Sequence, residues 1–424
     1  MRVGAPPTPP TTSSAGTSTA SAGVAIPVGA GCATAYPAAI ARLSSLPLAI
    51  AIALLCASVA GGAAAGAAGD RGPTSSAGQD AQKPKLTDVR CLAHCAGARR
   101  STVDGQVRLR GRHLAGVTEV IFPGESTEIV AAPDATERRK VEVTIPVGAI
   151  SGRPRARTST GAEARSRKPL RIVDVTELPT GFRLRESGVR PKRAFFDERG
   201  GIRLRYLFEA AERTGVRIQL SRKQGKRAVR SWREPNQLPY AKHSSSWNGL
   251  TGDRDAAPDG RYRFRVGPFG GPSKSAGSVR LHGHRFPVRG SHGYGGSLQS
   301  FGAPRSGGRR HQGQDVYAAC GTRLEAARGG EVKRRAYDPQ LYGHYVVIDG
   351  FKTKADHLYS HMTSPSRFKA GDRVHTGQRI GSVGKSGNAR TTPCHLHFEI
   401  WPRGWRSGSP VNPMPSLRRW DRWS

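Results

Sequence analysis

Short runs of alternating apolar and polar residues, separated by glycine- and proline-rich turns, constrain the fold of this chain more than any other feature. Apolar residues stand two apart at Val107 and Leu109, and the same period recurs in residues 141–145, 202–208 and 216–220. Side chains at positions i and i+2 share one face of a β-strand, so the pattern predicts half-buried strands. With 53 glycines and 30 prolines in 424 residues, we expect several strand-rich modules and a mainly β fold.

A set of histidine and aspartate residues in the last third of the chain indicates a metal site. HQGQD contains His311 and Asp315, YSHM contains His361, and CHLHFEI contains His395 and His397. A catalytic zinc usually takes three ligands from His, Asp or Glu and leaves its fourth position to a water, whose pKa the ion lowers. These five residues therefore predict a catalytic zinc site.

The spacing within the motifs fits this interpretation. In a strand, His395 and His397 project into one groove while Leu396 packs behind them. His311 and Asp315 are four apart and share a face in either a strand or a helix, and their neighbours favour a strand edge. An isolated H-x-H is also compatible with two packed or surface imidazoles. The prediction of a metal site therefore depends on the order of the motifs, with a glycine-rich segment before HLHFE.

Residues 286–401 resemble the lysostaphin-type (LytM-like) zinc endopeptidases, which cut peptide cross-links in bacterial cell walls. The resemblance implies an antiparallel-sheet peptidase domain that binds Zn²⁺ and acts on peptidoglycan. It assigns metal binding to His311, Asp315 and His397, and catalysis to His361 and His395. Which of the two catalytic histidines is the base, and which cross-link bond is cut, stay open. The alternative function is a non-catalytic protein of the same fold that binds peptidoglycan or activates a hydrolase.

The cysteines predict two disulfides. Cys320 follows the first metal motif and Cys394 directly precedes the second. Because the two motifs must meet around one ion, we expect a Cys320–Cys394 bridge, provided that the Cα atoms lie within about 7 Å. Cys91 and Cys95 are expected to pair across a tight turn. Together with His94 they form an alternative metal site, which lacks the second pair of ligands that structural zinc normally uses.

The first 69 residues are predicted to be a leader. Arg42 precedes the apolar run at residues 46–60, and small residues with an A-x-A pattern at residues 63–65 follow. An apolar run this short predicts an export signal, with a retained membrane anchor as the alternative. The protein is therefore expected in the cell wall or outside the cell.

The net charge of the chain limits the classes of molecule that it is expected to bind. Its 67 Lys and Arg residues outnumber 31 Asp and Glu residues, for a net charge of +36. This excess is spread along the chain and indicates a general affinity for polyanions, although the base composition of a GC-rich genome would also raise the arginine content. No motif that reads nucleic acid is recognisable, so we expect peptidoglycan and anionic wall polymers as partners, and no specific nucleic acid.

Two further modules are expected between the leader and the peptidase. Residues 85–175 contain VRLRGRHLAGVTEVIFPG, which resembles the opening of TIG-type immunoglobulin-like domains. Residues 176–280 end in a string that resembles the immunoglobulin-like domain of flagellar hook-capping proteins, with a turn at Asp259–Gly260 before an alternating strand at residues 262–266. The expected fold is thus two immunoglobulin-like sandwiches followed by the peptidase domain.

The remaining segments are assigned by composition. Residues 70–84 and 268–280 are rich in Gly, Ser, Pro and Lys and are predicted to be linkers. The peptidase domain is expected at residues 281–405. A basic tail at residues 406–424 carries Trp420 and Trp423, which we interpret as packing back onto the domain, with a stacking surface for sugar rings as the alternative.

Overall fold

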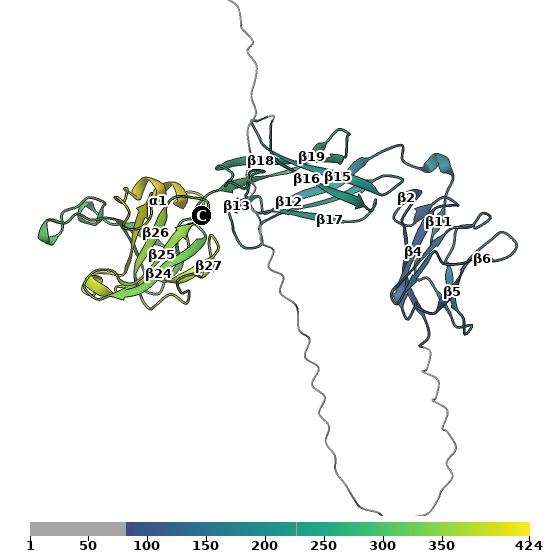
Figure 1. The fold of residues 1–424 in the computed structure, drawn as a ribbon, viewed down its shortest axis with the longest axis horizontal. Coiled ribbons are helices and arrows are strands. Elements are labelled where there is room, and N and C mark those ends of the chain that lie inside the picture. The colour runs from purple at the N-terminus through teal and green to yellow at the C-terminus, as the bar shows by residue number, and fades with distance from the viewer. Residues whose placement is uncertain (1–81, 226) are drawn as a thin grey trace, which may run out of the picture. The chain divides into compact units, whose positions relative to one another are not determined.

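The computed structural model describes residues 82–225 and 227–424, and this part of the chain is mainly β, as predicted (Figure 1). The expected leader and all but the last three residues of the expected linker at 70–84 lie outside the described residues. Among the helices of the described part, none combines the length and apolar character that crossing a bilayer requires.

The first module consists of two four-stranded sheets around one core. The sheets run, in spatial order, β1 (Lys85–Cys91), β4 (Gln106–Arg112), β8 (Lys140–Thr144), β7 (Ala135–Glu137) and β10 (Glu163–Arg165), β9 (Arg155–Thr158), β5 (Val117–Phe122), β6 (Ile129–Ala131). A small sheet contains β11 (Arg171–Ile172), β3 (Arg100–Ser101) and β2 (Cys95–Gly97), and the 3-10 helix η1 (Val175–Glu177) follows. Val107 and Leu109 are fully buried in the core, as the alternation predicts.

The second module also has two sheets. One contains β12 (Arg183–Arg190), β14 (Ile202–Glu209) and β17 (His243–Trp247), and the other contains β13 (Arg193–Phe195), β19 (Lys274–His282), β18 (Gly260–Pro268), β15 (Thr214–Arg222) and β16 (Ala228–Gln237). Tyr206 and Phe208 are buried, as predicted, and β18 begins at the expected Asp259–Gly260 turn. The family resemblances of these two modules stay predictions.

The linker predicted at residues 268–280 is wrong, because most of this segment belongs to β19. This strand pairs with β13 and β18 inside the five-stranded sheet. Its register shifts beside Ala276, where a bulge breaks the period of two. At Gly277, with φ +126°, an added Cβ would lie 2.9 Å from Val189. The small residues of this segment therefore allow a bulge and close packing. The same composition is also typical of a linker.

The third module holds the predicted metal motifs in a seven-stranded sheet. Its strands are, in spatial order, β21 (His292–Tyr294), β22 (Gln314–Ala318), β29 (His395–Trp401), β26 (Asp356–Met362), β25 (Gly343–Gly350), β24 (Gly330–Asp338) and β27 (Arg373–Val374). A three-stranded sheet contains β20 (Val288–Arg289), β23 (Arg323–Glu325) and β28 (Arg379–Ser382). The helices are η2 (Ser297–Gln299), η3 (Ser306–Gly308), η4 (Gly387–Ala389) and α1 (Met414–Asp421).

The core of the third module includes residues from the C-terminal tail. Leu396 of β29 is fully buried there, which leaves its neighbours His395 and His397 to the other face of the sheet. Leu417 and Trp420 of α1 are buried in the same core, and Trp423 packs against it. The two tryptophans of the tail therefore pack onto the domain, as the first of the two interpretations predicts.

Aromatic and charged contacts join the second and third modules. The ring of Phe351 packs against the core of the second module, 5.9 Å from the ring of Phe196. The Arg328 guanidinium lies 3.8 Å from the centre of the Phe196 ring, and Arg373 forms an ion pair with Asp197 at 2.7 Å. Cutting the chain between these modules would expose the contact surface, so the full chain is the suitable protein for functional experiments.

His357 of β26 is a fully buried imidazole outside the metal motifs. Its ring centre lies 5.8 Å from that of Phe398 and 6.2 Å from that of Trp420, and its Nδ1 has no hydrogen-bond partner in the described part of the chain. Burial, helped by the positive charge of Arg328, lowers the pKa of His357 to about 3. The side chain is therefore neutral and packs as an aromatic residue.

We expect His357→Phe to reduce the acid sensitivity of the fold. The unfolded chain takes up a proton at this residue below about pH 6.5, whereas the folded chain does so only near pH 3, so stability falls with pH between these values. Between pH 7 and pH 5 this residue alone should lower the free energy of unfolding by about 2 kcal/mol. Urea titrations of both proteins at the two pH values measure the difference, and equal losses would contradict the prediction.

Candidate metal centre

Two neighbouring strands bring the predicted metal ligands together. β22 pairs with β29, and Asp315 stands directly opposite His397, so their side chains share one face of the sheet. His311 lies just before β22, and Gly313 separates it from the strand. A Cβ at Gly313 would lie 2.7 Å from the His397 ring and 2.5 Å from the Phe398 carbonyl oxygen. The glycine in HxGxD is therefore needed for the close approach of the two ligand segments.

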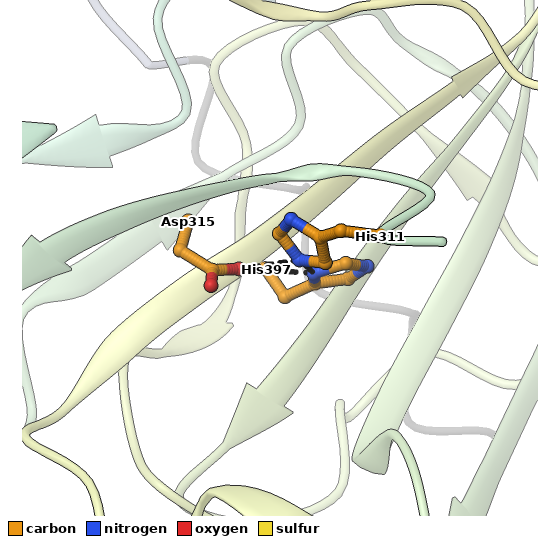
Figure 2. A group of neighbouring side chains, drawn as sticks. All are labelled: His311, Asp315 and His397. Carbon is orange, nitrogen blue, oxygen red and sulfur yellow. Dashed lines mark hydrogen bonds and ion pairs between the residues drawn. The ribbon is translucent and has the colours of Figure 1, made fainter. Parts of the chain in front are cut away.

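The three ligand atoms form a tight triangle, with the Asp315 carboxylate directed at both imidazoles (Figure 2). His311 Nε2 and His397 Nδ1 are 2.8 Å apart. Asp315 Oδ1 lies 3.0 Å from His397 Nδ1 and 3.2 Å from His311 Nε2. All three residues are buried. The structure thus groups the residues that the sequence predicts as ligands.

This arrangement fits a divalent ion such as zinc. Ligand atoms about 2.0–2.2 Å from a tetrahedral zinc lie roughly 3.3–3.5 Å from one another, close to the separations seen here. Two imidazole nitrogens and one carboxylate oxygen leave a fourth position free, which is the composition typical of a catalytic site. A cation bound between the three atoms would replace the proton that the two facing imidazole nitrogens otherwise share.

Hydrogen bonds orient both ligand imidazoles. His311 donates from Nδ1 to the Ser300 carbonyl oxygen at 2.9 Å, which leaves Nε2 as the lone-pair atom. His397 donates from Nε2 to Glu399 Oε1 at 2.9 Å, which leaves Nδ1 to face Asp315. Such partners hold the tautomer and the ring orientation that metal binding needs.

Glu399 is held in turn by two aromatic side chains. Tyr342 donates its hydroxyl to Oε1 at 3.2 Å, and Trp401 donates Nε1 to Oε2 at 2.6 Å. The carboxylate is 1% exposed, so these bonds are needed to satisfy it. The sequence alone is compatible with Glu399 either on the opposite face or as a support behind the ligands, and the structure places it behind His397. The period of two along HLHFE, which places both residues on one face, favours this second position.

Charge interactions within the triangle perturb the pKa values of its members. Burial would lower the pKa of His397, but hydrogen bonds to Asp315 and Glu399 outweigh it and raise that pKa to about 9. Burial would raise the pKa of Asp315, yet the bonds to His311 and His397 hold it well below its usual range. The two carboxylates thus create a strongly cation-attracting position at the sheet face.

His361 and His395, the two predicted catalytic residues, lie beside the triangle with ring centres 4.9 Å apart. His361 donates from Nδ1 to the Ser386 carbonyl oxygen at 2.8 Å, and His395 from Nδ1 to that of Pro393 at 2.9 Å. Each residue therefore keeps a bare Nε2. Burial lowers both pKa values, that of His361 to about 3, so each imidazole is neutral at physiological pH.

The backbone of His361 is strained. Its φ of +57° lies in the left-handed region, which only a few per cent of residues other than glycine adopt. The pairing of β25 with β26 is irregular at this point, and the His361 amide bonds to the Tyr342 carbonyl oxygen at 2.9 Å. Strain of this kind is frequent at functional sites, where the surrounding structure maintains it.

Both predicted disulfides are present. Cys320 and Cys394 have Cα atoms 5.3 Å apart, and the bond ties the end of β22 to the start of β29. It therefore braces the two strands that carry Asp315 and His397. Cys91 and Cys95 are also bonded, with Cα atoms 5.7 Å apart, so the alternative metal site with His94 is excluded.

The five residues lie in a groove with a volume of about 740 Å³. Further lining comes from the segment at residues 298–312, from Leu341 and Tyr342, from residues 388–392 and from Arg406. A groove that is open to solvent can admit an extended peptide to the metal ligands and the two neutral imidazoles. The fold and the site together define a metallopeptidase-type centre.

Comparison with known proteins gives the family of this module. Residues 309–413 match the family described as Peptidase family M23 and include all five site residues. The L-Ala–D-Glu endopeptidase of Bacillus subtilis (strain 168) is 30% identical over 160 residues, which are 35% of this chain and 48% of that protein. Peptidoglycan DD-endopeptidase ShyC of Vibrio cholerae is 37% identical over 99 residues, 23% of this chain and 21% of that protein.

Among solved structures, the catalytic domain of lysostaphin from Staphylococcus simulans is 27% identical, with a TM-score of 0.27 and coverage of 30% of this chain and 92% of that chain. The chain spans about half the length of the B. subtilis relative and about a fifth of the V. cholerae one. The chain carries a peptidase domain of family M23 at residues 309–413, which confirms the LytM-like resemblance of its motifs.

Proposed function

We propose that this protein is an exported, zinc-dependent endopeptidase that hydrolyses peptide bonds in the stem peptides or cross-bridges of peptidoglycan. One observation carries the proposal: His311 Nε2, Asp315 Oδ1 and His397 Nδ1 converge within 4.8 Å, beside two neutral imidazoles in one groove. The substrate class is supported by two relatives, of which one is named an L-Ala–D-Glu endopeptidase and the other a peptidoglycan DD-endopeptidase. The predicted leader and the two disulfides support export.

In this proposal, different residues hold the metal ion, transfer protons and orient the ligand imidazoles. A divalent ion held by His311, Asp315 and His397 would supply Lewis-acid polarisation of the scissile carbonyl and acidify the attacking water. His361 and His395 each offer a bare Nε2 that can accept the proton of this water, and the imidazole that has taken it up can then donate it to the departing amine. Their lowered pKa values leave both imidazoles unprotonated near neutral pH. Glu399 and Ser300 fix the ligand imidazoles so that only one nitrogen of each faces the ion.

The test is digestion of purified peptidoglycan by the full chain, with and without a chelator. We expect new free amines from the metal-loaded protein, none after chelation, and recovery when Zn²⁺ is added back. Elemental analysis of the purified protein identifies the metal. Reducing sugar without new amines would indicate a glycosidase, and firm binding of peptidoglycan without either product would favour the non-catalytic alternative.

A further inference from the structure

Four arginines line the same groove as the metal ligands: Arg305, Arg309, Arg310 and Arg406. Three of them belong to the segment between η2 and β22, and the fourth follows β29. Arg309, Arg310 and Arg406 are exposed, whereas Arg305 is half-buried. The groove thus has a positively charged rim built from two distant parts of the sequence.

These guanidinium groups have no carboxylate partner in the described part of the chain. Across residues 82–225 and 227–424, none of the four arginines forms an ion pair. Among the described residues, the carboxylates that line the groove are Asp315 and Glu399, which are buried and hydrogen-bonded to His397. The positive charge of the rim is therefore available to bind an anionic ligand. A bound divalent ion would make the groove still more positive.

Contacts with neighbouring residues restrict two of these side chains. Arg406 stacks on the Trp405 ring at 4.4 Å, and Arg305 donates one N–H to the Pro304 carbonyl oxygen at 3.1 Å. Because a guanidinium has five N–H donors, most donors of each arginine stay free for a carboxylate.

We propose that this rim makes the groove selective for peptides with free carboxylate groups near the scissile bond, in preference to neutral peptides. A guanidinium fork matches a carboxylate in a bidentate geometry, and these charge-assisted bonds are stronger than neutral ones. A neutral bridge, such as oligoglycine, offers the rim no charge and gains nothing from it. The selectivity rests on the proposed function, because it concerns the substrate of the same site.

The experiment compares two substrates that differ only in charge. One is a soluble peptidoglycan fragment whose stem peptides keep their free carboxylates, and the other is the same fragment with these groups converted to carboxamides. The full, metal-loaded chain should cleave the charged fragment with a kcat/KM about tenfold higher, mainly through a lower KM. The preference should shrink at high salt, because the contacts are partly exposed to solvent.

Two charge-neutralising variants locate the effect. Arg305→Gln and Arg406→Gln should each reduce the preference, and the double variant should reduce it further, with its metal content unchanged. Arg403→Gln is the matched control, since Arg403 is an exposed arginine in the turn just before that of Arg406 but does not line the groove. This control should keep the full preference.

The possible results separate the two proposals. Equal cleavage of both fragments by the unmodified protein would overturn the selectivity while leaving the endopeptidase function intact. Cleavage of neither fragment would contradict the endopeptidase function itself. A loss of preference in Arg403→Gln as large as in Arg406→Gln would show a general effect of surface charge, and would overturn the assignment to the rim.

Discussion

We expect the His311→Ala variant to lose its bound metal and roughly 1,000-fold or more of its hydrolytic activity. The substitution removes Nε2 from a triangle whose edges involving this atom measure 2.8 and 3.2 Å, and two ligands remain where three are needed. Lewis-acid stabilisation of the transition state is worth several kcal/mol, and about 4 kcal/mol corresponds to a thousandfold in rate. Metal analysis and the release of free amines from peptidoglycan measure both losses.

The stability of the same variant gives an independent readout. Zinc should raise the melting temperature of the unmodified protein, because an ion that binds only the folded state stabilises it, and should leave that of His311→Ala unchanged. His344→Ala is the matched control, since His344 lies in the same sheet but outside the groove lining. Full metal content in His311→Ala would show that the ligands have been assigned wrongly.

The second large effect is expected for His361→Asn, which should keep the metal but lose roughly 10²- to 10⁴-fold in kcat. The variant removes the bare Nε2 from the groove and leaves the three ligands untouched. Asparagine suits the test because it tolerates the left-handed backbone of this position, where φ is +57°. The loss therefore reports on proton transfer and not on the fold.

Metal content and the rate on peptidoglycan together decide the outcome. A variant that loses both metal and activity would indicate that His361 holds the ion in place. One that keeps near-normal activity would leave His395 as the residue that moves the proton. Comparing His361→Asn, His395→Asn and the double variant shows whether the two imidazoles act as a unit, since residues that do so have strongly non-additive effects.

The features that could be predicted from the sequence are those with a local physical signature. The period of two placed Val107, Leu109, Tyr206 and Phe208 in buried cores, because side chains along a strand alternate between two faces. The same rule explains why Leu396 enters the core between two histidines of the site. The Cys320–Cys394 bridge followed from a simple constraint, since two motifs that are expected to share one ion must lie close together.

Other features depend on contacts that no local pattern shows. The segment of β19 has the composition of a linker, yet it forms an interior strand because a bulge and Gly277 allow it to pack against Val189. The left-handed backbone of His361 arises where β25 and β26 pair irregularly. A property set by the neighbouring strand cannot be predicted from the residues of one strand alone.

The sequence by itself determined the mainly β class, the residues able to bind a metal, the cysteine pairs and the peptidase family. These features depend on the spacing and the chemistry of side chains, which can be read directly from the sequence. Only the tertiary structure decided that Asp315 stands opposite His397, that Glu399 holds the ring of His397, and that Arg305 and Arg406 line one groove. These relations join residues that are distant along the chain, and the register of the sheet, not local propensity, brings them together.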